Sequence, residues 1–387
     1  MNNIETEKPF SVLIPDGESN YAISVLRCLA QTKNVRSYIL SNDPWAPIRF
    51  SRYSTRFFSY KNEQGNEGRL AAIRDAVKKT NVDVVLPVDV ETIRLLSLGC
   101  EALSQLTSII SLPKTYVIDI AEDKWLLAKW LNKNQIPHPP TLLYETNDSF
   151  DEALSALTFP VLIKPRKGSG GKGINFFDNP SALYIFCKEH VSSGEFIVQS
   201  FINGYDIDCS VLCQEGEILA YTIQKGIMYD TQHISWPSGL DFLYDESTYN
   251  VVREMVGKFS WSGIVHIDLR YDEQDKQIKV IEMNPRFWAS VSASIFAGVN
   301  FPYLACLNGL KRDLPKVVIQ PKRVLRSGPA IRSLVQRFVN GKQGDISFDN
   351  SFIEFILRDP LPTMVGKYSK IHNRIFNKRQ KTLTRYM

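Results

Sequence analysis

Residues 280–286 read Val-Ile-Glu-Met-Asn-Pro-Arg, and Ile-Asp-Leu stands at residues 267–269. Polar and apolar residues alternate in both segments, which indicates two strands that each bury one face. Glu282 and Asn284 lie two residues apart, so they point to the same side of their strand, and Asp268 on a neighbouring strand could converge with them. Two carboxylates and one amide oxygen form a donor set that suits Mg²⁺ shared with phosphates.

Each of these polar residues, taken alone, could be a solvated side chain on the exposed face of a strand. The residues that alternate with them are apolar: Ile267, Leu269, Ile281 and Met283. Carboxylates gathered on the other face need a cation nearby, because burying like charges without one is costly. The two segments therefore favour a cation-binding face over two unrelated surface strands.

A glycine-rich stretch lies about a hundred residues upstream. Residues 163–173 read Ile-Lys-Pro-Arg-Lys-Gly-Ser-Gly-Gly-Lys-Gly, which predicts a strand ending near Lys164 and a loop behind it. Glycine allows a backbone to approach phosphate oxygens closely, because it has no Cβ and tolerates positive φ. The spacing differs from the G-x-x-x-x-G-K-[ST] motif, so a P-loop NTPase is disfavoured, and a flexible hairpin tip is the structural alternative.

Between these two regions, residues 196–208 predict a strand that runs into a short connector. An exposed backbone at such a connector could pair with the edge of a purine, and Asp206 just beyond it could accept hydrogen bonds from ribose hydroxyls. Most junctions between strands look like this and bind nothing, so this segment is weak by itself.

The first third of the chain alternates strand and helix patterns, which predicts βαβ units and a parallel sheet. The expected strands are residues 10–15, 35–40 and 82–88, and the expected helices are residues 21–30, 69–79 and 91–103. The turn at residues 15–19 lacks G-x-G-x-x-G, so a NAD-dependent dehydrogenase is a poor candidate. Four residues at strand ends could touch a substrate or simply serve turns and helix caps: Asp16, Gly17, Glu18 and Asp89.

The pattern changes after residue 115, where we expect a domain boundary and then an α+β unit with antiparallel strands. The expected helices are residues 123–134, 181–190 and 246–259. The expected strands are residues 159–165, 195–201, 206–214, 218–225, 263–271 and 277–282.

The composition is that of a globular protein, with 387 residues of which 44% are hydrophobic and 22% charged. It excludes a largely disordered, fibrous or small disulfide-stapled chain and predicts two or three domains. The apolar runs are far shorter than the roughly 20 residues of a membrane helix. The six cysteines match no zinc or redox spacing, so we expect reduced thiols in a cytoplasmic protein.

The formal charge of +5 is concentrated at the C-terminal end. Residues 360–387 carry seven basic and no acidic side chains, whereas the rest of the chain carries 39 basic and 41 acidic ones. The near-neutral body argues against a nucleic-acid-binding core, so no nucleic-acid partner is expected. The basic tail, which follows an apolar cluster at 352–357, could make weak contact with an anionic membrane surface or a partner; a solvated basic helix is the plainer interpretation.

Together the segments resemble the ATP-grasp superfamily over about residues 10–310. Residues 280–286 look like the large subunit of carbamoyl-phosphate synthetase and related carboxylate–amine ligases. The resemblance implies an α/β and α+β architecture in four parts. These are an N-terminal Rossmann-like pre-ATP-grasp domain (1–115), a lid subdomain with the glycine-rich loop (116–200), a Mg-binding C-terminal subdomain (201–312) and a helical extension with the basic tail (313–387).

The resemblance also implies roles for individual residues. Lys124 and Lys164 would contact the ATP phosphates, and Lys164 and Arg286 would be catalytic, with Arg286 stabilising the transferring phosphoryl group. The remaining nucleotide-binding positions would be Gly168, Ser169, Gly170, Gly171, Gly173, Gln199, Ser200, Phe201, Ile202 and Asp206. One or two Mg²⁺ ions, or Mn²⁺ in their place, would be held by Asp268, Glu282 and Asn284.

Other positions depart from the family pattern or match it loosely. His266 occupies a position that looks like an arginine in D-alanine–D-alanine ligases, which disfavours that substrate class. Lys225 lies on a strand that in relatives contributes a phosphate-contacting lysine, and a surface lysine is the equal alternative. The positions that would decide the substrate have no pattern that identifies it: His233, Trp236 and Asp241 in the loop 228–244, Arg270 and Trp288.

The activity implied by the resemblance is that of an ATP-dependent carboxylate–amine ligase. A carboxylate would attack the γ-phosphate to give ADP and an acyl phosphate, and an amine would then displace phosphate to form an amide or peptide bond. A kinase-like phosphotransferase without ligation is the alternative, since the first half-reaction is itself phosphoryl transfer. The expected partners are a small-molecule carboxylate and amine, and a homodimer is compatible with this reading. A third hypothesis is an interaction protein that acts through its C-terminal region.

Overall fold

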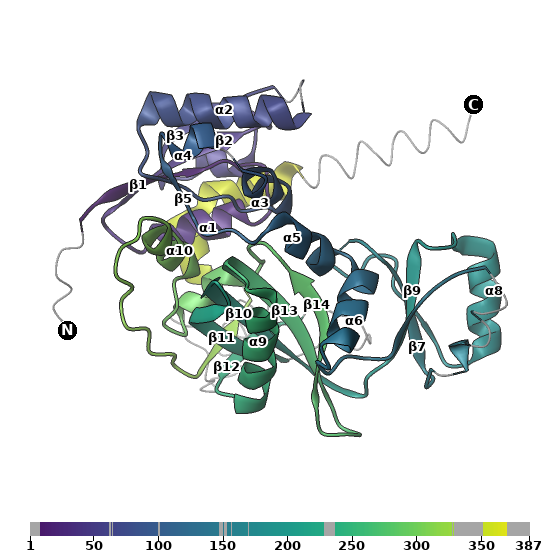
Figure 1. The fold of residues 1–387 in the computed structure, drawn as a ribbon. Helices are drawn as coiled ribbons and strands as arrows, with labels where there is room; N and C mark the ends of the chain where they lie inside the picture. The colour runs from purple at the N-terminus through teal and green to yellow at the C-terminus, as the bar shows by residue number, and fades with distance from the viewer. Residues whose placement is uncertain are drawn as a thin grey trace. The chain divides into compact units, whose positions relative to one another are not determined.

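The computed structural model describes residues 8–61, 63, 65–99, 101–146, 150, 153–155, 157–168, 170–227, 237–326, 328 and 351–369. The chain forms two compact units, whose elements are labelled in Figure 1. The first consists of Met1–Ser111, Phe287–Val318 and Val324–Met387, and the second of Leu112–Arg286 and Ile319–Arg323.

These units differ from the ranges expected from sequence at one boundary in particular. Residues 287–312 were expected to continue the C-terminal subdomain, but they pack in the first unit. The Phe287 N–H donates to Val88 O, and α10 (Phe301–Gly309) packs against the parallel sheet. The division into four functional domains (1–115, 116–200, 201–312 and 313–387) stays a prediction.

The first unit contains a five-stranded sheet in the order β3-β2-β1-β4-β5, and every neighbouring pair is parallel. Its strands are β1 (Phe10–Ile14), β2 (Val35–Ser41), β3 (Ser54–Ser59), β4 (Val84–Val85) and β5 (Ser108–Ile109). Helical elements of this unit are α1 (Ala22–Leu29), η1 (Pro47–Phe50), α2 (Gly65–Thr80), α3 (Val90–Ser97), α4 (Glu101–Ser104), η2 (Val291–Ile295), α10 and α12 (Ile353–Arg358). The predicted parallel α/β sheet is therefore confirmed.

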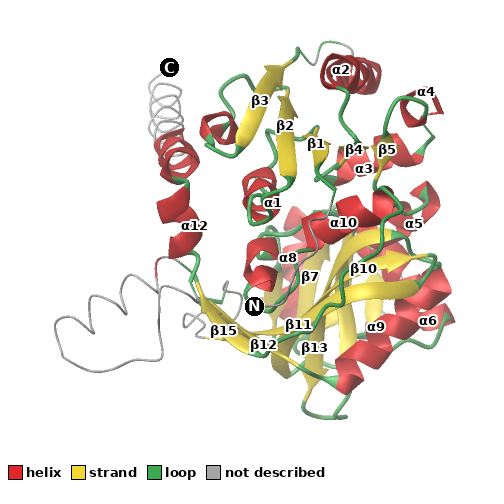
Figure 2. Cartoon of the chain, turned by 90° about the vertical axis from the view of Figure 1, so that its left-hand side faces the viewer, coloured by secondary structure: helices red, strands yellow, loops and turns green. Residues whose placement is uncertain are grey.

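The second unit contains two antiparallel sheets. The smaller has the order β6-β9-β7-β8, with strands β6 (Thr141–Leu143), β7 (Val161–Pro165), β8 (Asn175–Phe177) and β9 (Phe196–Ser200). The larger has the order β14-β13-β10-β11-β12-β15, with strands β10 (Gly204–Gln214), β11 (Glu217–Ile227), β12 (Gly239–Leu243), β13 (Gly263–Asp272), β14 (Ile278–Asn284) and β15 (Lys322–Leu325). Figure 2 shows β10 to β13 of this sheet beside α9 (Glu246–Phe259).

Helix ends in the second unit follow capping rules that are visible in the sequence. Asp245 precedes α9, and its Oδ1 accepts a hydrogen bond from the Thr248 N–H at 2.7 Å. Ser260 ends that helix in the left-handed conformation at φ +49°. Asp123 caps α6 (Lys124–Lys133) in the same way as Asp245 caps α9. These caps satisfy backbone groups that a helix end leaves without partners.

The core of the second unit lies on one face of the larger sheet. Alternate residues of β10, β13 and β14 are buried there together with residues of α9, α6 and α5 (Thr115–Glu122), as expected from strands that alternate apolar and polar positions. Trp130 and Phe259 stack at 3.5 Å between ring centroids within this layer. The smaller sheet has its own core, which includes Leu183 of α8 (Pro180–His190).

Several expected elements differ in extent. Only Val84 and Val85 of the expected strand 82–88 pair as a strand, and the chain then turns toward the cap of α3 at Asp89. The expected helix 91–103 is the two helices α3 and α4, separated near Gly99, whose φ is +96°.

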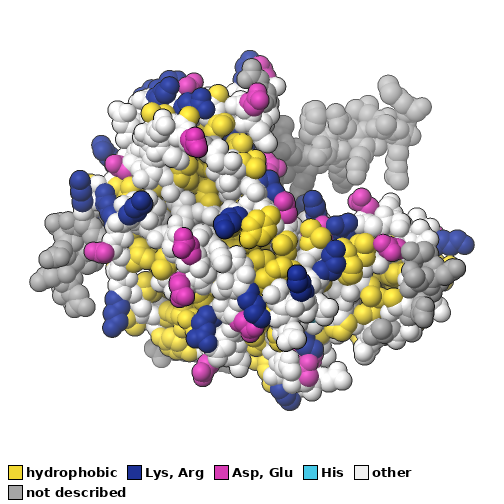
Figure 3. All heavy atoms as spheres, in the orientation of Figure 1, with side chains coloured by type: hydrophobic (Ala, Val, Ile, Leu, Met, Phe, Trp, Pro, Cys, Tyr) yellow, Lys and Arg dark blue, Asp and Glu magenta, His cyan; other side chains and the backbone are white. Residues whose placement is uncertain are grey.

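The described cysteines, which are all of them except Cys100, are buried free thiols. Within the described residues, no helix combines the length and apolarity needed to cross a membrane. On the face drawn in Figure 3, Lys and Arg side chains are interspersed with Asp and Glu side chains.

Candidate functional site

Two rows of polar side chains cross the larger sheet of the second unit on the face opposite its core. Paired residues point to the same side of a sheet, so the cross-strand register fixes which side chains share this face. One row consists of Gln224, Asp208, Asp268 and Glu282, and the next of Thr222, Ser210, His266 and Asn284. The three predicted metal ligands therefore lie together on one face.

Short contacts join these predicted ligands to each other and to two cations. Asn284 Nδ2 donates to Asp268 Oδ2 at 3.3 Å, and Arg286 Nη2 donates to Asn284 Oδ1 at 3.0 Å. Lys124 Nζ lies 3.6 Å from Glu282 Oε2. Burial raises the pKa of Glu282, and the Lys124 charge opposes that rise. Carboxylate and amide oxygens on one partly buried face fit the ligand preference of Mg²⁺.

The structure adds Asp208 and His266 to this group. One ligand atom from each of Asp208, His266 and Asp268 lies within 4.8 Å of the others. His266 Nε2 is 3.1 Å from Asp268 Oδ1, and its Nδ1 is 2.9 Å from the Ser210 hydroxyl. Burial and the adjacent Asp268 raise the pKa of Asp208. Asp208 was not predicted as a ligand, because only residues 267–269 and 280–286 indicated the cation-binding face, although the alternation of Asp206, Asp208 and Ser210 places it there.

The glycine-rich loop begins beside these residues. Lys124 Nζ donates to Gly168 O at 2.8 Å, so one ammonium group contacts both the loop and, at its other side, Glu282. Gly168 and Gly170 have φ values of +118° and +75°, and a Cβ on either would meet no atom within 4 Å. Gly171 and Gly173 also have positive φ, as the loop prediction requires, and Ser169 lies outside the described residues.

Lys164 is a buried lysine on the smaller sheet. Its Nζ donates to Gln199 Oε1 at 2.8 Å, and Gln199 Nε2 donates to the Thr141 hydroxyl at 2.9 Å. Burial lowers the pKa of Lys164 to about 8, and of the charges that act on it Glu282 raises the pKa most, while Lys124 lowers it. Two predicted phosphate-binding lysines therefore lie close enough to act on each other and on Glu282.

The predicted adenine segment, residues 199–202, has part of its backbone already engaged. The Ser200 N–H donates to Pro140 O at 3.0 Å, and the Phe201 N–H donates to Pro160 O at 2.9 Å. These two amides are therefore unavailable to a base. Ile202 O accepts a hydrogen bond at 2.7 Å from Arg270 Nε.

Arg270, which was expected only among the positions that would decide the substrate, lies beside the predicted ribose contact. Its guanidinium bonds to Asp206, the predicted ribose contact, and donates to Gly204 O at 2.9 Å. Its Cζ lies 5.1 Å from the centre of the Phe201 ring. The cross-strand pairing of Asp206 with Arg270, two opposite charges, is the signal that predicts this contact once the register is known.

The structure bears differently on three further positions, Lys225, His233 and Gly204. Lys225 pairs with Ile207, so it lies on the face opposite the polar rows, and its Nζ rests 3.3 Å from the centre of the Tyr205 ring. That placement disfavours a phosphate contact by Lys225. His233 lies outside the described residues. Gly204 has φ +155°, and a Cβ there would come within 1.9 Å of Tyr271 O, so the connector requires glycine.

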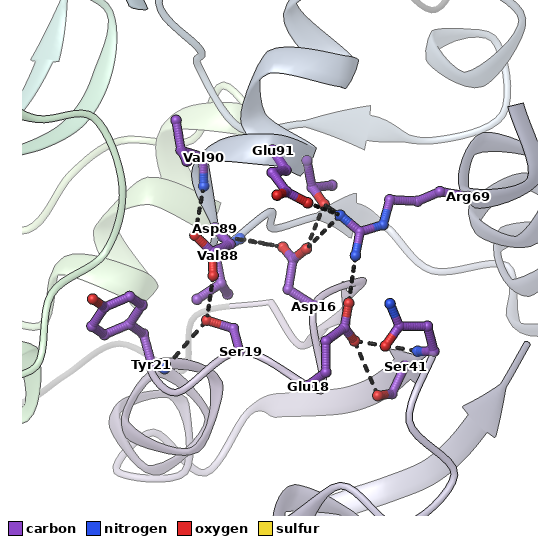
Figure 4. A network of polar contacts seen from close by, with 12 residues as sticks. Asp16, Glu18, Ser19, Tyr21, Ser41, Arg69, Val88, Asp89, Val90 and Glu91 are labelled. Atoms are coloured by element: carbon purple, nitrogen blue, oxygen red, sulfur yellow. Dashed lines mark hydrogen bonds and ion pairs between the residues drawn. The ribbon is translucent and has the colours of Figure 1, made fainter. Parts of the chain in front are cut away.

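A separate hollow of about 210 Å³ lies in the first unit, and Figure 4 shows the polar network in it. It sits at the carboxyl ends of β1, β2 and β4, where a doubly wound sheet commonly binds ligands. Asp16 accepts from the Val88 N–H at 2.7 Å, and Glu18 accepts from the Ser41 hydroxyl at 3.0 Å. Asp89 caps α3. These carboxylates thus serve caps and turns, one of the two interpretations that the sequence left open.

Arg69 is the cation at the centre of this network. Its Nε donates to the Tyr60 hydroxyl and its Nη1 to the Thr92 hydroxyl, both at 2.9 Å, and its Nη2 bonds to Glu18. Asp16 Oδ1 lies 3.9 Å from Arg69 Nη1. Burial raises the pKa of Asp16 to about 6, although its hydrogen bonds and Arg69 counteract the rise.

We expect Arg69→Met to lower the free energy of unfolding by about 3 kcal/mol at neutral pH, because it leaves buried carboxylates without their cation. Urea denaturation measures this, with Lys78→Met on the exposed face of α2 as the control that should change little. The Arg69 charge lowers the pKa of Asp16, so without it the folded-state pKa lies further above the unfolded value, and acidification through about pH 6 favours the folded state of the variant more than that of wild type. The difference in the free energy of unfolding between wild type and variant should therefore shrink at about pH 5. A difference that is constant with pH would contradict the pairing of Arg69 with the ionised Asp16.

Comparison with known proteins identifies the second unit. Residues 121–290 match the family model described as an ATP-grasp domain. The arginine-specific large chain of carbamoyl phosphate synthase from Halalkalibacterium halodurans is 26% identical over 190 residues, which cover 47% of this chain and 18% of that protein. The corresponding large chain from Methanobrevibacter smithii is 29% identical over 186 residues, 44% of this chain and 17% of that protein. The match spans less than a fifth of these relatives.

Solved structures share the fold over most of the chain. N5-carboxyaminoimidazole synthetase from Staphylococcus aureus has a TM-score of 0.65 at 17% identity, covering 88% of each chain. The biotin carboxylase domain of 2-oxoglutarate carboxylase from Hydrogenobacter thermophilus has 0.61 at 16%, covering 82% of this chain and 73% of that one. L-amino acid ligase from Bacillus licheniformis has 0.55 at 18%, covering 79% and 74%. The predicted resemblance is confirmed: the chain contains an ATP-grasp domain and has the ATP-grasp fold.

Proposed function

We propose that the protein is an ATP-dependent carboxylate–amine ligase that forms an amide or peptide bond through an acyl phosphate. The observation that carries the proposal is the position of Lys124, whose ammonium contacts Gly168 O of the glycine-rich loop at 2.8 Å and lies 3.6 Å from Glu282. A phosphate chain held at this point would meet the loop, the lysines and the acidic face of the sheet together.

The residues divide into three roles under this proposal. Lys124 and Lys164 hold the phosphates, and the loop from Gly168 to Gly173 closes over them. Asp268, Glu282 and Asn284 hold Mg²⁺, or Mn²⁺ in its place, which neutralises charge on the phosphate oxygens. Structures of ATP-grasp neighbours in complex with ADP and with MgADP support nucleotide and Mg²⁺ as ligands.

The adenosine contacts follow from what the backbone leaves available. The Ser200 and Phe201 amides are already bonded and Ile202 O accepts from Arg270, so the Ile202 N–H is the main-chain group of the segment that would face adenine. Asp206 would accept from the ribose hydroxyls while Arg270 holds its carboxylate and the connector in place. Gln199 then orients Lys164 and is not itself required to touch the base.

Two steps complete the reaction. A carboxylate oxygen attacks the γ-phosphorus, the new P–O bond forms as the bond to the bridging oxygen breaks, and ADP leaves with the electron pair. The amine nitrogen then attacks the acyl carbon, and phosphate leaves as the C–N bond forms and the amine loses a proton. Arg286, which is anchored on Asn284 Oδ1 at 3.0 Å, would stabilise the charge on the transferring phosphoryl group.

The name of L-amino acid ligase, one of the fold neighbours, supports an amine and a carboxylate as substrates. For the oligomeric state, a homodimer is the simplest arrangement to test. A phosphotransferase is the second candidate, because it would use the same contacts to the phosphates.

Nucleotide product analysis tests the proposal. Purified protein is incubated with MgATP and pools of amino acids, other carboxylates and amines, beside a Glu282→Gln control. We expect ADP and phosphate only with a substrate pool, and an amide in the product mass spectrum. ADP formation that ignores every carboxylate and amine would contradict ligation, a stable phosphorylated product without amide would favour the phosphotransferase, and AMP with pyrophosphate would exclude the acyl-phosphate route.

A further inference from the structure

The C-terminal helical segment of the first unit, residues 360–369, exposes an apolar stripe. Leu361, Met364 and Tyr368 are 55%, 62% and 70% exposed, and their spacing of three and four residues places them on one side of a helix. Leu357 at the end of α12 is 66% exposed and precedes them. Large apolar side chains that recur on one exposed side usually mark a contact surface.

The opposite side of this segment is fixed to the unit. Arg27 Nη2 donates to the Thr363 hydroxyl at 3.0 Å and also bonds to Asp359 O. Asp359, which is buried, accepts from the Ser51 hydroxyl at 2.8 Å. Pro362 is buried between these anchors. The stripe is therefore held outward by a packed inner side.

Basic residues lie beside and after the stripe. Lys367 and Arg52 are exposed, and the Arg52 N–H donates to Asp359 Oδ1 at 3.1 Å. Arg358 is also exposed, but it is paired with Glu354 at 2.7 Å. The chain then continues through six basic and no acidic residues: Lys370, Arg374, Lys378, Arg379, Lys381 and Arg385. These six lie outside the described residues, and they add six positive charges to the chain directly after the stripe.

We propose that the apolar stripe (Leu361, Met364 and Tyr368) is a docking surface for an anionic lipid bilayer, and that the charge of the basic residues that follow it in the sequence favours this partner. Apolar side chains on one side of a helix can insert at the boundary of headgroups and acyl chains, while Lys and Arg pair with anionic headgroups. A second copy of the chain is a poorer occupant, because two tails of this charge would repel each other at a shared stripe. The proposal is independent of the reaction assigned to the ATP-grasp domain.

Vesicle sedimentation of the full chain tests the docking surface. We expect most of the protein to sediment with phosphatidylcholine vesicles that contain about 30% phosphatidylserine, and little with phosphatidylcholine alone. Salt at about 0.5 M should release it, because the Debye length then falls to a few ångströms.

Three variants separate the contributions. Substituting Leu361, Met364 and Tyr368 together by Ser should reduce the vesicle partition coefficient about tenfold, and substituting the six tail residues by Gln should reduce it at least as much. Tyr184→Ser with Ile185→Ser is the matched control, since these residues of α8 are 57% and 60% exposed but far from the stripe in sequence. Circular dichroism and nucleotide binding verify that each variant is folded.

Each other outcome overturns the proposal. Equal binding to neutral vesicles would remove the role of anionic lipid, and unchanged binding of the Ser variant would remove the stripe. If the protein does not sediment with vesicles but light scattering shows a dimer that the Ser variant breaks, the stripe is an interface between copies. Absence of both results would mean that the stripe is an ordinary exposed surface.

Discussion

Replacing Glu282 by Gln should lower ATP-dependent ADP formation by about 10³-fold without lowering the thermal midpoint. Glu282 lies opposite Asp268 across β13 and β14 and 3.6 Å from Lys124, at the centre of the acidic face. Gln keeps the shape and one oxygen but removes the charge that, under the proposed function, would bind a divalent cation. Removing one of two adjacent carboxylates also relieves repulsion, so the folded state should not be weakened.

A coupled assay for ADP and a thermal melt measure the two effects in parallel. Glu217→Gln is the matched control, because Glu217 is an exposed carboxylate at the start of β11 in the same sheet. It should leave both quantities unchanged. Full turnover in the Glu282 variant would exclude this residue from the metal site. A large fall in its thermal midpoint would mean that the lost activity reflects unfolding.

The parallel sheet of the first unit was predictable because its central strands β1 and β4 are buried on both faces and amphipathic helices separate its strands. β1 is buried at all five positions, which a short continuous apolar run signals directly. Residues 287–312 were expected in the C-terminal subdomain and pack in the first unit, and α10 gives no local sign of this because it is apolar on nearly all sides. Such a helix has no polar side to indicate which layer it covers, and only tertiary contacts with β4 and β5 decide it.

The polar face that carries Asp268, Glu282 and Asn284 was predictable for a different reason. A period of two is a local property, so Glu282 and Asn284 could be assigned to one face from the sequence. Asp208 and Arg270 required the register between β10 and β13, which depends on pairing over about 60 residues of sequence. For the same reason Lys225 could not be assigned to a face until its pairing with Ile207 was known.

In the network around Arg69 in the first unit, the sequence singled out the carboxylates but did not decide their role. Asp16, Glu18 and Asp89 were predicted to be either substrate contacts or caps. Their hydrogen bonds to backbone amides and hydroxyls identify the structural role, because those bonds occupy carboxylate oxygens. No sequence pattern indicates that Arg69, about 50 residues further along the chain, is the common partner of Asp16 and Glu18.

Replacing Lys164 by Met should have opposite effects on activity and stability. Activity should fall by at least about 10²-fold, because under the proposed function Lys164 is a cation that holds the phosphates. The free energy of unfolding at about pH 7 should rise by about 2 kcal/mol. The fall in the pKa of Lys164 from 10.5 to about 8 corresponds to a cost of about 3 kcal/mol for burying the charge, which the variant no longer has. The variant also loses the hydrogen bond to Gln199, which contributes about 1 kcal/mol in the opposite direction.

The dependence on pH distinguishes this explanation from a general packing effect. The folded-state pKa of Lys164 lies below the unfolded value, so from about pH 8 to about pH 10.5 the unfolded chain binds more protons. The burial cost is therefore complete below about pH 8, and the stability contributed by this group rises with pH through that window. Urea denaturation of wild type and variant should give a difference that narrows toward about pH 10. Lys188→Met, an exposed lysine of α8, should show no such difference. A Met variant that is less stable at every pH would contradict this explanation, because it would show that the buried Lys164 ammonium stabilises the folded state.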